Sequence, residues 1–181
     1  LIQGFALDAA EFSPRSEADL LKYCYHVAGV VGLMMACIMG VAADDEETLS
    51  RANDLGLAFQ LANIARDIGE DADAGRCYIP SQWLADQGIL PGEHMKPQHR
   101  PGMAKIAQRM ADMAAGYEAS ARIGARRLPF RSRWAVLAAA GIYGDIAREV
   151  ARRGPAAWDS RVVTSKSAKL GWVARALWQS L

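Results

Sequence analysis

The twelve residues from Gln60 to Asp71 constrain the fold of this chain most, because their polar side chains recur at helical spacing. The polar positions are three or four residues apart, and on an α-helix they fall within an arc of roughly 80°. These positions are Gln60, Asn63, Asp67 and Asp71. The residues between them are mostly apolar. The pattern predicts a packed helix that carries one stripe of two amides and two carboxylates.

Oxygen ligands at this spacing suit a hard divalent cation such as Mg²⁺, which favours carboxylates, retains several waters and bridges to phosphate. Asp67 and Asp71 lie near the end of the predicted helix, where the helix dipole disfavours carboxylates, so their charge needs compensation. A cation would provide it, and so would Arg66 or Arg76. The pattern therefore predicts either a metal site, with Glu70 as a further candidate ligand, or helix carboxylates paired with arginines.

The chain is long enough for one domain with a core, and its composition favours helices. It has 181 residues, of which 51% are hydrophobic and 8% aromatic, and it shows no strand alternation and no repeat. Long helices are expected over residues 17–41, 44–73, 103–127 and 131–153, with Ser16 and Asp44 as the first two N-caps. A short helix (81–87), a loop (88–102) and a last amphipathic helix (165–178) complete the prediction. We therefore expect an all-α fold with antiparallel helices around a central cavity.

Charge is distributed unevenly, although the formal net charge is only +1. Residues 41–75 contain nine acids and two arginines, whereas residues 120–181 contain twelve Lys or Arg and three acids. Two such halves can hold metal ions and an anionic ligand between them, although solvated helix faces produce the same pattern. The basic residues between Arg122 and Arg133 lack interleaved aromatics, and no nucleic-acid motif is present. Nucleic-acid binding is therefore not expected.

An uncharged segment, residues 27–43, is short for a membrane span and is expected to form a buried core helix. Its Gly29 and Gly32 each cost about 1 kcal/mol in a helix interior, which predicts close approach by a neighbouring helix or by an apolar ligand. The cysteines show no paired ligand spacing. We expect reduced thiols in a cytoplasmic protein, with Cys24 and Cys37 in the core.

Four sequence blocks together resemble the squalene/phytoene synthase family, and the likeness runs through nearly the whole chain. Residues 23–34, YCYHVAGVVGLM, are similar to a glycine-bearing helix of the family. Residues 60–71 resemble its second aspartate-rich motif, QxxNxxRDxxED. Residues 75–80, GRCYIP, resemble the GRxYxP segment that follows the motif. Residues 158–166, WDSRVVTSK, resemble the carboxy-terminal segment of the phytoene-forming members.

The resemblance implies an isoprenoid synthase fold and a head-to-head condensation of two geranylgeranyl diphosphates. The reaction passes through a cyclopropyl intermediate, prephytoene diphosphate, and ends at phytoene. The implied cofactor is Mg²⁺ or Mn²⁺, since a divalent cation and basic groups stabilise the departing diphosphate. The carbocation requires a dry apolar cavity without nucleophiles.

The resemblance also implies roles for individual residues. Asp67 and Asp71 would hold Mg²⁺, Asn63 would complete that site, and Gln60 would line the reaction cavity. Tyr143 and Arg161 would contact the diphosphate, and Arg76 would join the substrate-binding residues. The prenyl chains would be faced by Tyr25, Gly29 and Gly32.

Two alternative functions remain open at this point. A squalene or dehydrosqualene synthase would use farnesyl diphosphate, and the depth of the cavity would decide between the two chain lengths. A non-catalytic relative of the same fold would act as an interaction protein, although the presence of Asn63, Asp67 and Asp71 argues against it. The sequence leaves the oligomeric state undetermined.

The lipid nature of substrate and product is compatible with a peripheral contact at the inner membrane of a cytoplasmic protein. Residues near the end of the chain could form an interfacial helix, and core packing of the tryptophans is the alternative. The residues concerned are Lys169, Trp172, Arg175 and Trp178.

The sequence departs from the family pattern in one respect. The family uses two aspartate-rich motifs on facing helices, whereas Asp67-x-x-x-Asp71 is the only DxxxD here, and residues 1–5 resemble a segment well inside the family's domain. We therefore expect residues 1–181 to be the carboxy-terminal part of a single isoprenoid synthase domain.

A chain with half of the metal site should not complete the reaction. We predict that the 181-residue polypeptide, incubated with geranylgeranyl diphosphate and Mg²⁺, forms no phytoene. Chromatographic detection of phytoene from the purified chain would contradict this prediction.

Overall fold

The computed structural model describes residues 1–181 and confirms the all-α prediction, since the chain contains helices and no strand. A π-helical turn, η1 (Tyr25–Gly29), joins the second and third helices into one rod, and two short 3₁₀ turns lie at Pro97–His99 and Gly154–Ala156. The α-helices are α1 (Ile2–Ala9), α2 (Glu17–Cys24), α3 (Val30–Ile38), α4 (Glu46–Asp73), α5 (Ser81–Asp86), α6 (Arg100–Ala125), α7 (Phe130–Arg153) and α8 (Lys166–Ser180).

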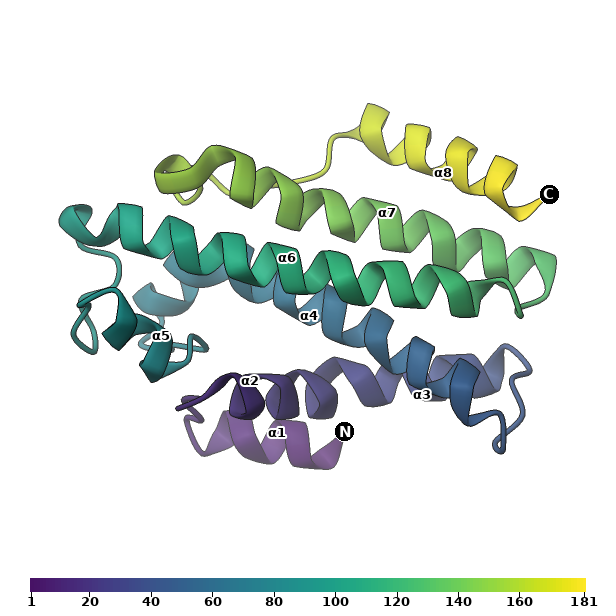
Figure 1. Cartoon of the computed structure of the whole chain (residues 1–181), viewed down its shortest axis with the longest axis horizontal. Helices are drawn as coiled ribbons and strands as arrows, with labels where there is room; N and C mark the ends of the chain where they lie inside the picture. Colours follow the sequence, from purple (N-terminus) through teal and green to yellow (C-terminus); the bar gives the residue numbers. More distant parts are fainter.

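The three long helices α4, α6 and α7 pack together, and each of them runs antiparallel to the next along the chain (Figure 1). The rod of α2, η1 and α3 lies on one side of α4, with α1 beside it. On the other side of the molecule α8 lies along α7 and forms an outer edge. The helix α4 is therefore the element that the amino-terminal rod and the carboxy-terminal helices share.

Local signals explain most of the helix ends. The predicted N-cap at Ser16 is confirmed at α2 and forms a capping box, in which the Ser16 side chain accepts the Asp19 N–H and the Asp19 side chain accepts the Ser16 N–H. The predicted cap at Asp44 is wrong by one residue, because the Asp45 side chain accepts the Thr48 N–H at 3.1 Å and starts α4.

The predicted loop over residues 88–102 is too long. The helix α6 already begins at Arg100, because a proline such as Pro101 in the first turn needs no N–H partner.

The segment at residues 27–43 is not the buried core helix that the sequence predicted. Only Gly29 and Ala36 are buried in it, and large apolar side chains such as Met34 and Ile38 are exposed. Within the rod, η1 packs against both α4 and α1, whereas α3 packs one side against α4 and leaves its opposite side exposed. Cys37 is exposed for the same reason, whereas Cys24 is buried as predicted.

By length and composition, one stretch of helix could cross a membrane, namely Glu17–Ile38 with a mean hydropathy of 1.5. Core helices of soluble proteins meet the same criterion. In this structure the stretch packs along α4 and forms part of the wall of a cavity.

The glycines of the rod bring its backbone against the backbone of α4. A Cβ atom added at Gly32 would overlap the carbonyl oxygen of Ala52. In the reverse direction, a Cβ added at Gly56 of α4 would lie 2.6 Å from the carbonyl carbon of Ala28 and 2.7 Å from the Cα of Gly29. The close approach of a neighbouring helix, one of the two explanations for these glycines, is therefore what the structure contains.

This contact predicts opposite effects for two glycine-to-alanine substitutions. Gly56→Ala should destabilise the fold by about 1–3 kcal/mol, because the atoms that the new Cβ meets are backbone and cannot rotate away. Gly116→Ala, on an exposed face of α6 with open space around it, should stabilise by about 0.5–1 kcal/mol. Urea denaturation measures both values, and equal effects at the two positions would contradict the proposed contact.

Candidate active site

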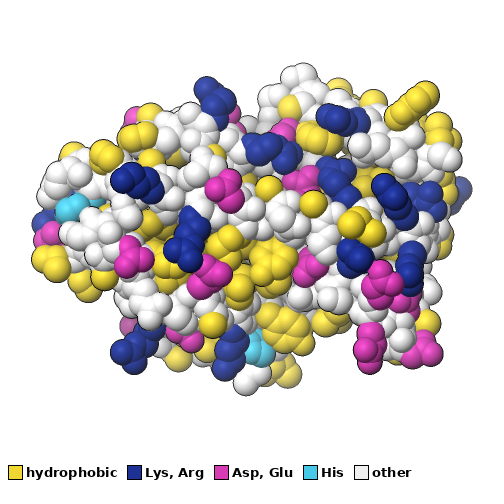
Figure 2. Space-filling model, viewed as in Figure 1, with side chains coloured by type: hydrophobic (Ala, Val, Ile, Leu, Met, Phe, Trp, Pro, Cys, Tyr) yellow, Lys and Arg dark blue, Asp and Glu magenta, His cyan; other side chains and the backbone are white.

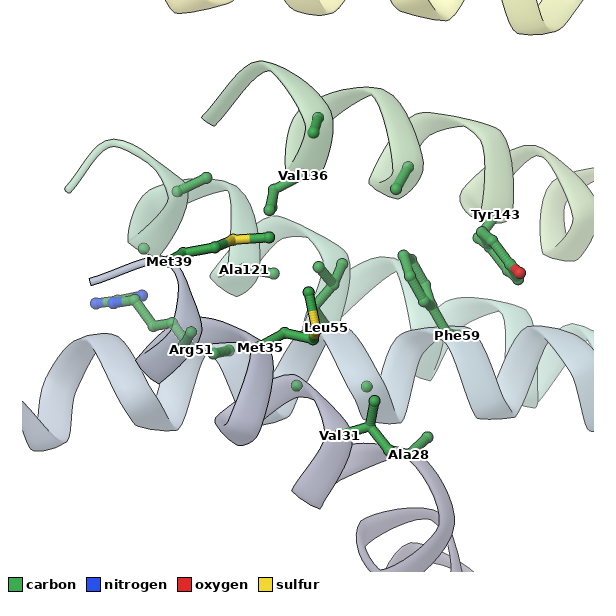
Figure 3. Close-up of a pocket in the computed structure, with 18 of the residues that line it drawn as sticks. Ala28, Val31, Met35, Met39, Arg51, Leu55, Phe59, Ala121, Val136 and Tyr143 are labelled. Carbon is green, nitrogen blue, oxygen red and sulfur yellow. The ribbon is translucent and has the colours of Figure 1, made fainter. Parts of the chain in front are cut away.

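The main cavity of the molecule lies between the α2–α3 rod, α4, α6 and α7, and its volume is about 440 Å³. Figure 3 shows its walls, with Val31 and Met35 on the rod facing Val136 on α7. The wall that α4 provides is one continuous helix face, composed of Thr48, Arg51, Ala52, Leu55, Gly56, Phe59, Gln60 and Asn63. From Thr48 to Asn63 this face is about 22 Å long at the helical rise of 1.5 Å per residue.

The two ends of the cavity differ in chemistry. Arg51 and Met39 lie at one end and Phe59 and Tyr143 at the other (Figure 3). The Arg51 guanidinium is engaged with Glu47 at 3.2 Å. At the other end the Tyr143 ring stacks on Phe59 with a centroid separation of 4.2 Å. The two predicted amide residues, Gln60 and Asn63, line the cavity on the turns next to this aromatic pair.

Asp67 and Asp71 continue the same face of α4 one and two turns beyond Asn63, outside the cavity. Asp67 accepts two hydrogen bonds from Arg66, at 2.7 and 2.6 Å, and pairs with Arg161 at 3.1 Å. Asp71 pairs with Arg76 at 3.4 Å. Both carboxylates are thus compensated by arginines.

The electrostatics of this cluster follow from burial and pairing. Burial raises the pKa of Asp71, and the neighbouring Arg76 opposes that rise. The hydrogen bond to Asp67 raises the pKa of Arg66. Asp71 therefore carries its charge at a cost that a bound cation would reduce.

A carboxy-terminal strap, residues 157–165, crosses α4 at the carboxylates. The Trp158 indole N–H donates to the Ala65 carbonyl at 3.0 Å, and the Trp158 side chain lies beside Gly69. This anchor places Arg161 against Asp67 and also against Glu70, with which it forms an ion pair. The structure therefore brings Arg161 to Asp67 and Glu70 from a position more than 90 residues further along the chain.

The donor chemistry at the cluster fits a hard divalent cation only in part. Asp67 and Asp71 offer carboxylate oxygens and Asn63 offers an amide oxygen, which are ligands that Mg²⁺ accepts. No three Asp, Glu, His or Cys side chains of the chain lie close enough together to hold an ion. A complete coordination shell would need further oxygens, from water, diphosphate or additional carboxylates.

The remaining predicted residues fall in different places. Gly32 lines the cavity, as do Gln60, Asn63 and Tyr143. Gly29 lies against the Asn53 side chain and does not line the cavity. Tyr25 is 39% exposed, and its ring meets the edge of His26. The roles implied for these residues stay predictions.

Sequence reasoning did not find several residues of the site. Thr48, Arg51 and Phe59 line the cavity, and their signal was present in the sequence as an extension of the same helical spacing upstream of Gln60. His94 had no such signal, because it comes from the loop before α6. It is buried beside Asp71 and Arg76 in a second, small cavity, and burial lowers its pKa.

Comparison with known proteins agrees with this architecture. The family model for squalene/phytoene synthase matches residues 1–168. The 15-cis-phytoene synthase of Enterobacter agglomerans is 48% identical over 180 residues, which cover 99% of this chain and 60% of that protein. The 15-cis-phytoene synthase of a Paracoccus species is 47% identical over 94% of this chain and 55% of its own length. The chain thus spans less than two thirds of these relatives.

Solved structures show the same fold. A dehydrosqualene synthase crystallised with a ligand superposes with a TM-score of 0.85 at 26% identity, over 96% of this chain and 61% of that chain. The squalene synthase HpnC from Alicyclobacillus acidocaldarius superposes with a TM-score of 0.78 at 24% identity, over 84% of this chain and 57% of its own, and this likeness concerns the fold alone.

The cavity contains one polar atom whose removal should stabilise the fold. The Thr48 hydroxyl is buried at the wall without a hydrogen-bond partner. Thr48→Val keeps the shape and should stabilise by about 1 kcal/mol. The matched control is Thr164→Val, because the Thr164 hydroxyl donates to the Ile142 carbonyl at 3.0 Å and its loss should cost about 1 kcal/mol. Urea denaturation measures both, and a destabilised Thr48→Val variant would contradict the geometry.

Proposed function

Because the chain belongs to the squalene/phytoene synthase family, we propose that it forms the catalytic carboxy-terminal part of a Mg²⁺-dependent phytoene synthase of carotenoid biosynthesis. The enzyme would condense two geranylgeranyl diphosphates to prephytoene diphosphate and convert this intermediate to phytoene. One observation supports the proposal most. A single face of α4 lines an apolar cavity and then, within two turns, presents carboxylates that are paired with arginines.

The dimensions of the cavity support a twenty-carbon substrate. The α4 wall is about 22 Å long. The sixteen main-chain carbons of an extended geranylgeranyl group span about 19 Å and the twelve of a farnesyl group about 14 Å, at a carbon–carbon bond length near 1.5 Å. The longer chain would therefore match the α4 wall from Asn63 to Thr48, and the shorter chain would end before Arg51. The squalene-type alternative is disfavoured on this ground.

The arginines of the cluster suit the departure of diphosphate. A divalent cation, when bound, supplies charge neutralisation for the leaving group. Asp67, Asp71 and Asn63 would hold this cation. The guanidinium groups of Arg66, Arg76 and Arg161 lie beside the same carboxylates and can donate to diphosphate oxygens. The developing negative charge would thus be met by the bound cation together with these preorganised guanidinium groups.

The aromatic end of the cavity suits the carbocation. Phe59 and Tyr143 stack at the end nearest the carboxylates, where an allylic cation forms when diphosphate leaves. Aromatic faces stabilise a cation without reacting with it. The apolar side chains of the rod and of α7 exclude water, which would otherwise capture the cation. Gln60, at the same end, would orient the reacting groups by hydrogen bonding.

The proposal is tested in the complete reading frame to which the chain belongs, with phytoene measured by chromatography. Asp67→Ala should reduce turnover of geranylgeranyl diphosphate by about 100-fold or more, because a transition-state charge partner is lost. Asp73→Ala is the matched control. Asp73 is an exposed carboxylate on the last turn of the same helix and forms no ion pair. Its variant should retain turnover within about twofold.

Unchanged turnover in Asp67→Ala would defeat the catalytic assignment. A higher kcat/KM with farnesyl than with geranylgeranyl diphosphate would assign the squalene-type activity instead. The absence of turnover with either diphosphate in a folded protein would leave the non-catalytic relative as the explanation.

A further inference from the structure

One side of the helix α8 packs against α7, and the opposite side is exposed to solvent. Toward α7, the Trp172 indole lies against Gly141 and donates to Asp145, and Ala176 and Ser180 are buried. Away from α7, apolar residues recur at i, i+4, i+7, i+8 and i+11. They are Leu170, Ala174, Leu177, Trp178 and Leu181. Trp178 is 79% exposed, and Leu170 is 70% exposed. An exposed apolar stripe of this kind on a surface helix is a candidate interaction face.

The charges of this helix have one sign. Lys166, Lys169 and Arg175 are exposed on it, and no acidic residue follows Asp159 in the chain. Figure 2 shows hydrophobic and basic side chains together over the edge of the molecule that α8 forms in Figure 1. The combination of an apolar stripe, an interfacial tryptophan and lysines is typical of a helix that lies in the surface of an anionic membrane.

The structure also separates the two tryptophans of this helix. Trp172 is a packing residue, because its indole N–H is bonded and three guanidinium groups lie over its ring. These belong to Arg175 of the same helix, Arg122 and Arg148, at 5.2, 5.4 and 5.6 Å from the ring centroid. Trp178 makes no such contact. Of the two alternatives given for these tryptophans, core packing therefore applies to Trp172, whereas Trp178 is free for a membrane contact.

We propose that the stripe of α8, from Leu170 to Leu181, docks on the headgroup region of an anionic lipid bilayer with the helix axis parallel to the membrane. The helix is about 22 Å long, which suits a contact in the plane of the interface. Two hydrogen bonds from α7 fix the position of α8. The Trp134 indole donates to the Val173 carbonyl at 2.8 Å, and Arg133 donates to the Ser180 carbonyl.

The other exposed apolar face, on α3, does not suit an anionic surface. It carries Met34 and Ile38 and no basic residue, and the acidic run from Asp44 to Glu47 follows directly. Figure 2 shows these acids gathered where α4 begins. The charge difference therefore favours α8 over α3 as the lipid-binding face, and the two faces provide a matched comparison.

The test is co-sedimentation of the protein expressed from the complete reading frame with vesicles, which requires neither substrate nor turnover and is independent of the proposed function. We expect partition onto vesicles that contain roughly one third anionic lipid, and weaker partition onto zwitterionic vesicles or at high salt. The variant Leu170→Gln, Leu177→Gln, Trp178→Gln should lose at least about tenfold in the partition coefficient. The control Met34→Gln, Ile38→Gln on α3 should stay within about twofold.

A variant without two lysines of α8 measures the electrostatic component of the membrane contact. Lys166→Gln with Lys169→Gln should lower partition about 10- to 30-fold on anionic vesicles, since each lysine contributes about 1 kcal/mol near such a surface. It should leave the weak partition onto zwitterionic vesicles unchanged.

Circular dichroism checks that each variant keeps its helices. Equal binding by the triple α8 variant, or equal loss in the α3 control, would overturn the proposal. If sedimentation velocity without vesicles shows a dimer that only the α8 variant dissociates, and vesicle binding is absent, the occupant is a second copy of the chain and the membrane assignment fails.

Discussion

The direct contact between the backbones of α4 and the α2–α3 rod is the constraint on which the rest of the structure depends. Gly32 and Gly56 allow this approach, because a Cβ atom at either position would overlap carbonyl groups of the other helix. The approach sets the position of Val31 and Met35 relative to α4 and thereby one wall of the cavity. Because α4 also carries the carboxylates, the same contact sets where the cavity lies relative to them.

The carboxylates at the end of α4 need charge compensation, because carboxylates near a helix carboxyl terminus oppose the helix dipole. The sequence indicated two possible sources of this compensation, a cation or arginines. In the structure arginines supply the compensation, with Arg66 and Arg76 from nearby in the chain and Arg161 from the strap. Both sources of compensation, a cation and arginines, are compatible with the proposed diphosphate-binding site. In the proposed reaction, a cation bound by the carboxylates would free these arginines to donate to the diphosphate.

The two exposed apolar faces, on α3 and α8, show that exposure alone does not determine which kind of partner a face suits. Their apolar side chains are similar, but α3 is followed by acids whereas α8 carries only bases. This difference in charge is the reason that the proposed membrane contact is assigned to α8 and not to α3. The same unevenness of charge along the sequence suggested an anionic ligand between two halves. The structure shows that part of it is consumed in direct pairs such as Arg161 with Asp67, and Arg127 with Asp45.

The sequence by itself determined what repeats locally along a helix. The all-α class, the cap at Ser16 and the stripe from Gln60 to Asp71 follow from spacing within one helix, and each is present. For Gly32 the sequence predicted a close neighbour, and the structure identified it as the backbone of α4. Only the tertiary structure decided which faces are covered. It exposed Cys37 and the outer side of α3, brought Arg161 to Asp67, buried His94 beside Asp71 and left Tyr25 outside the cavity. Periodicity reports which residues share a face, whereas burial depends on what packs against that face, and the partners here come from distant parts of the chain.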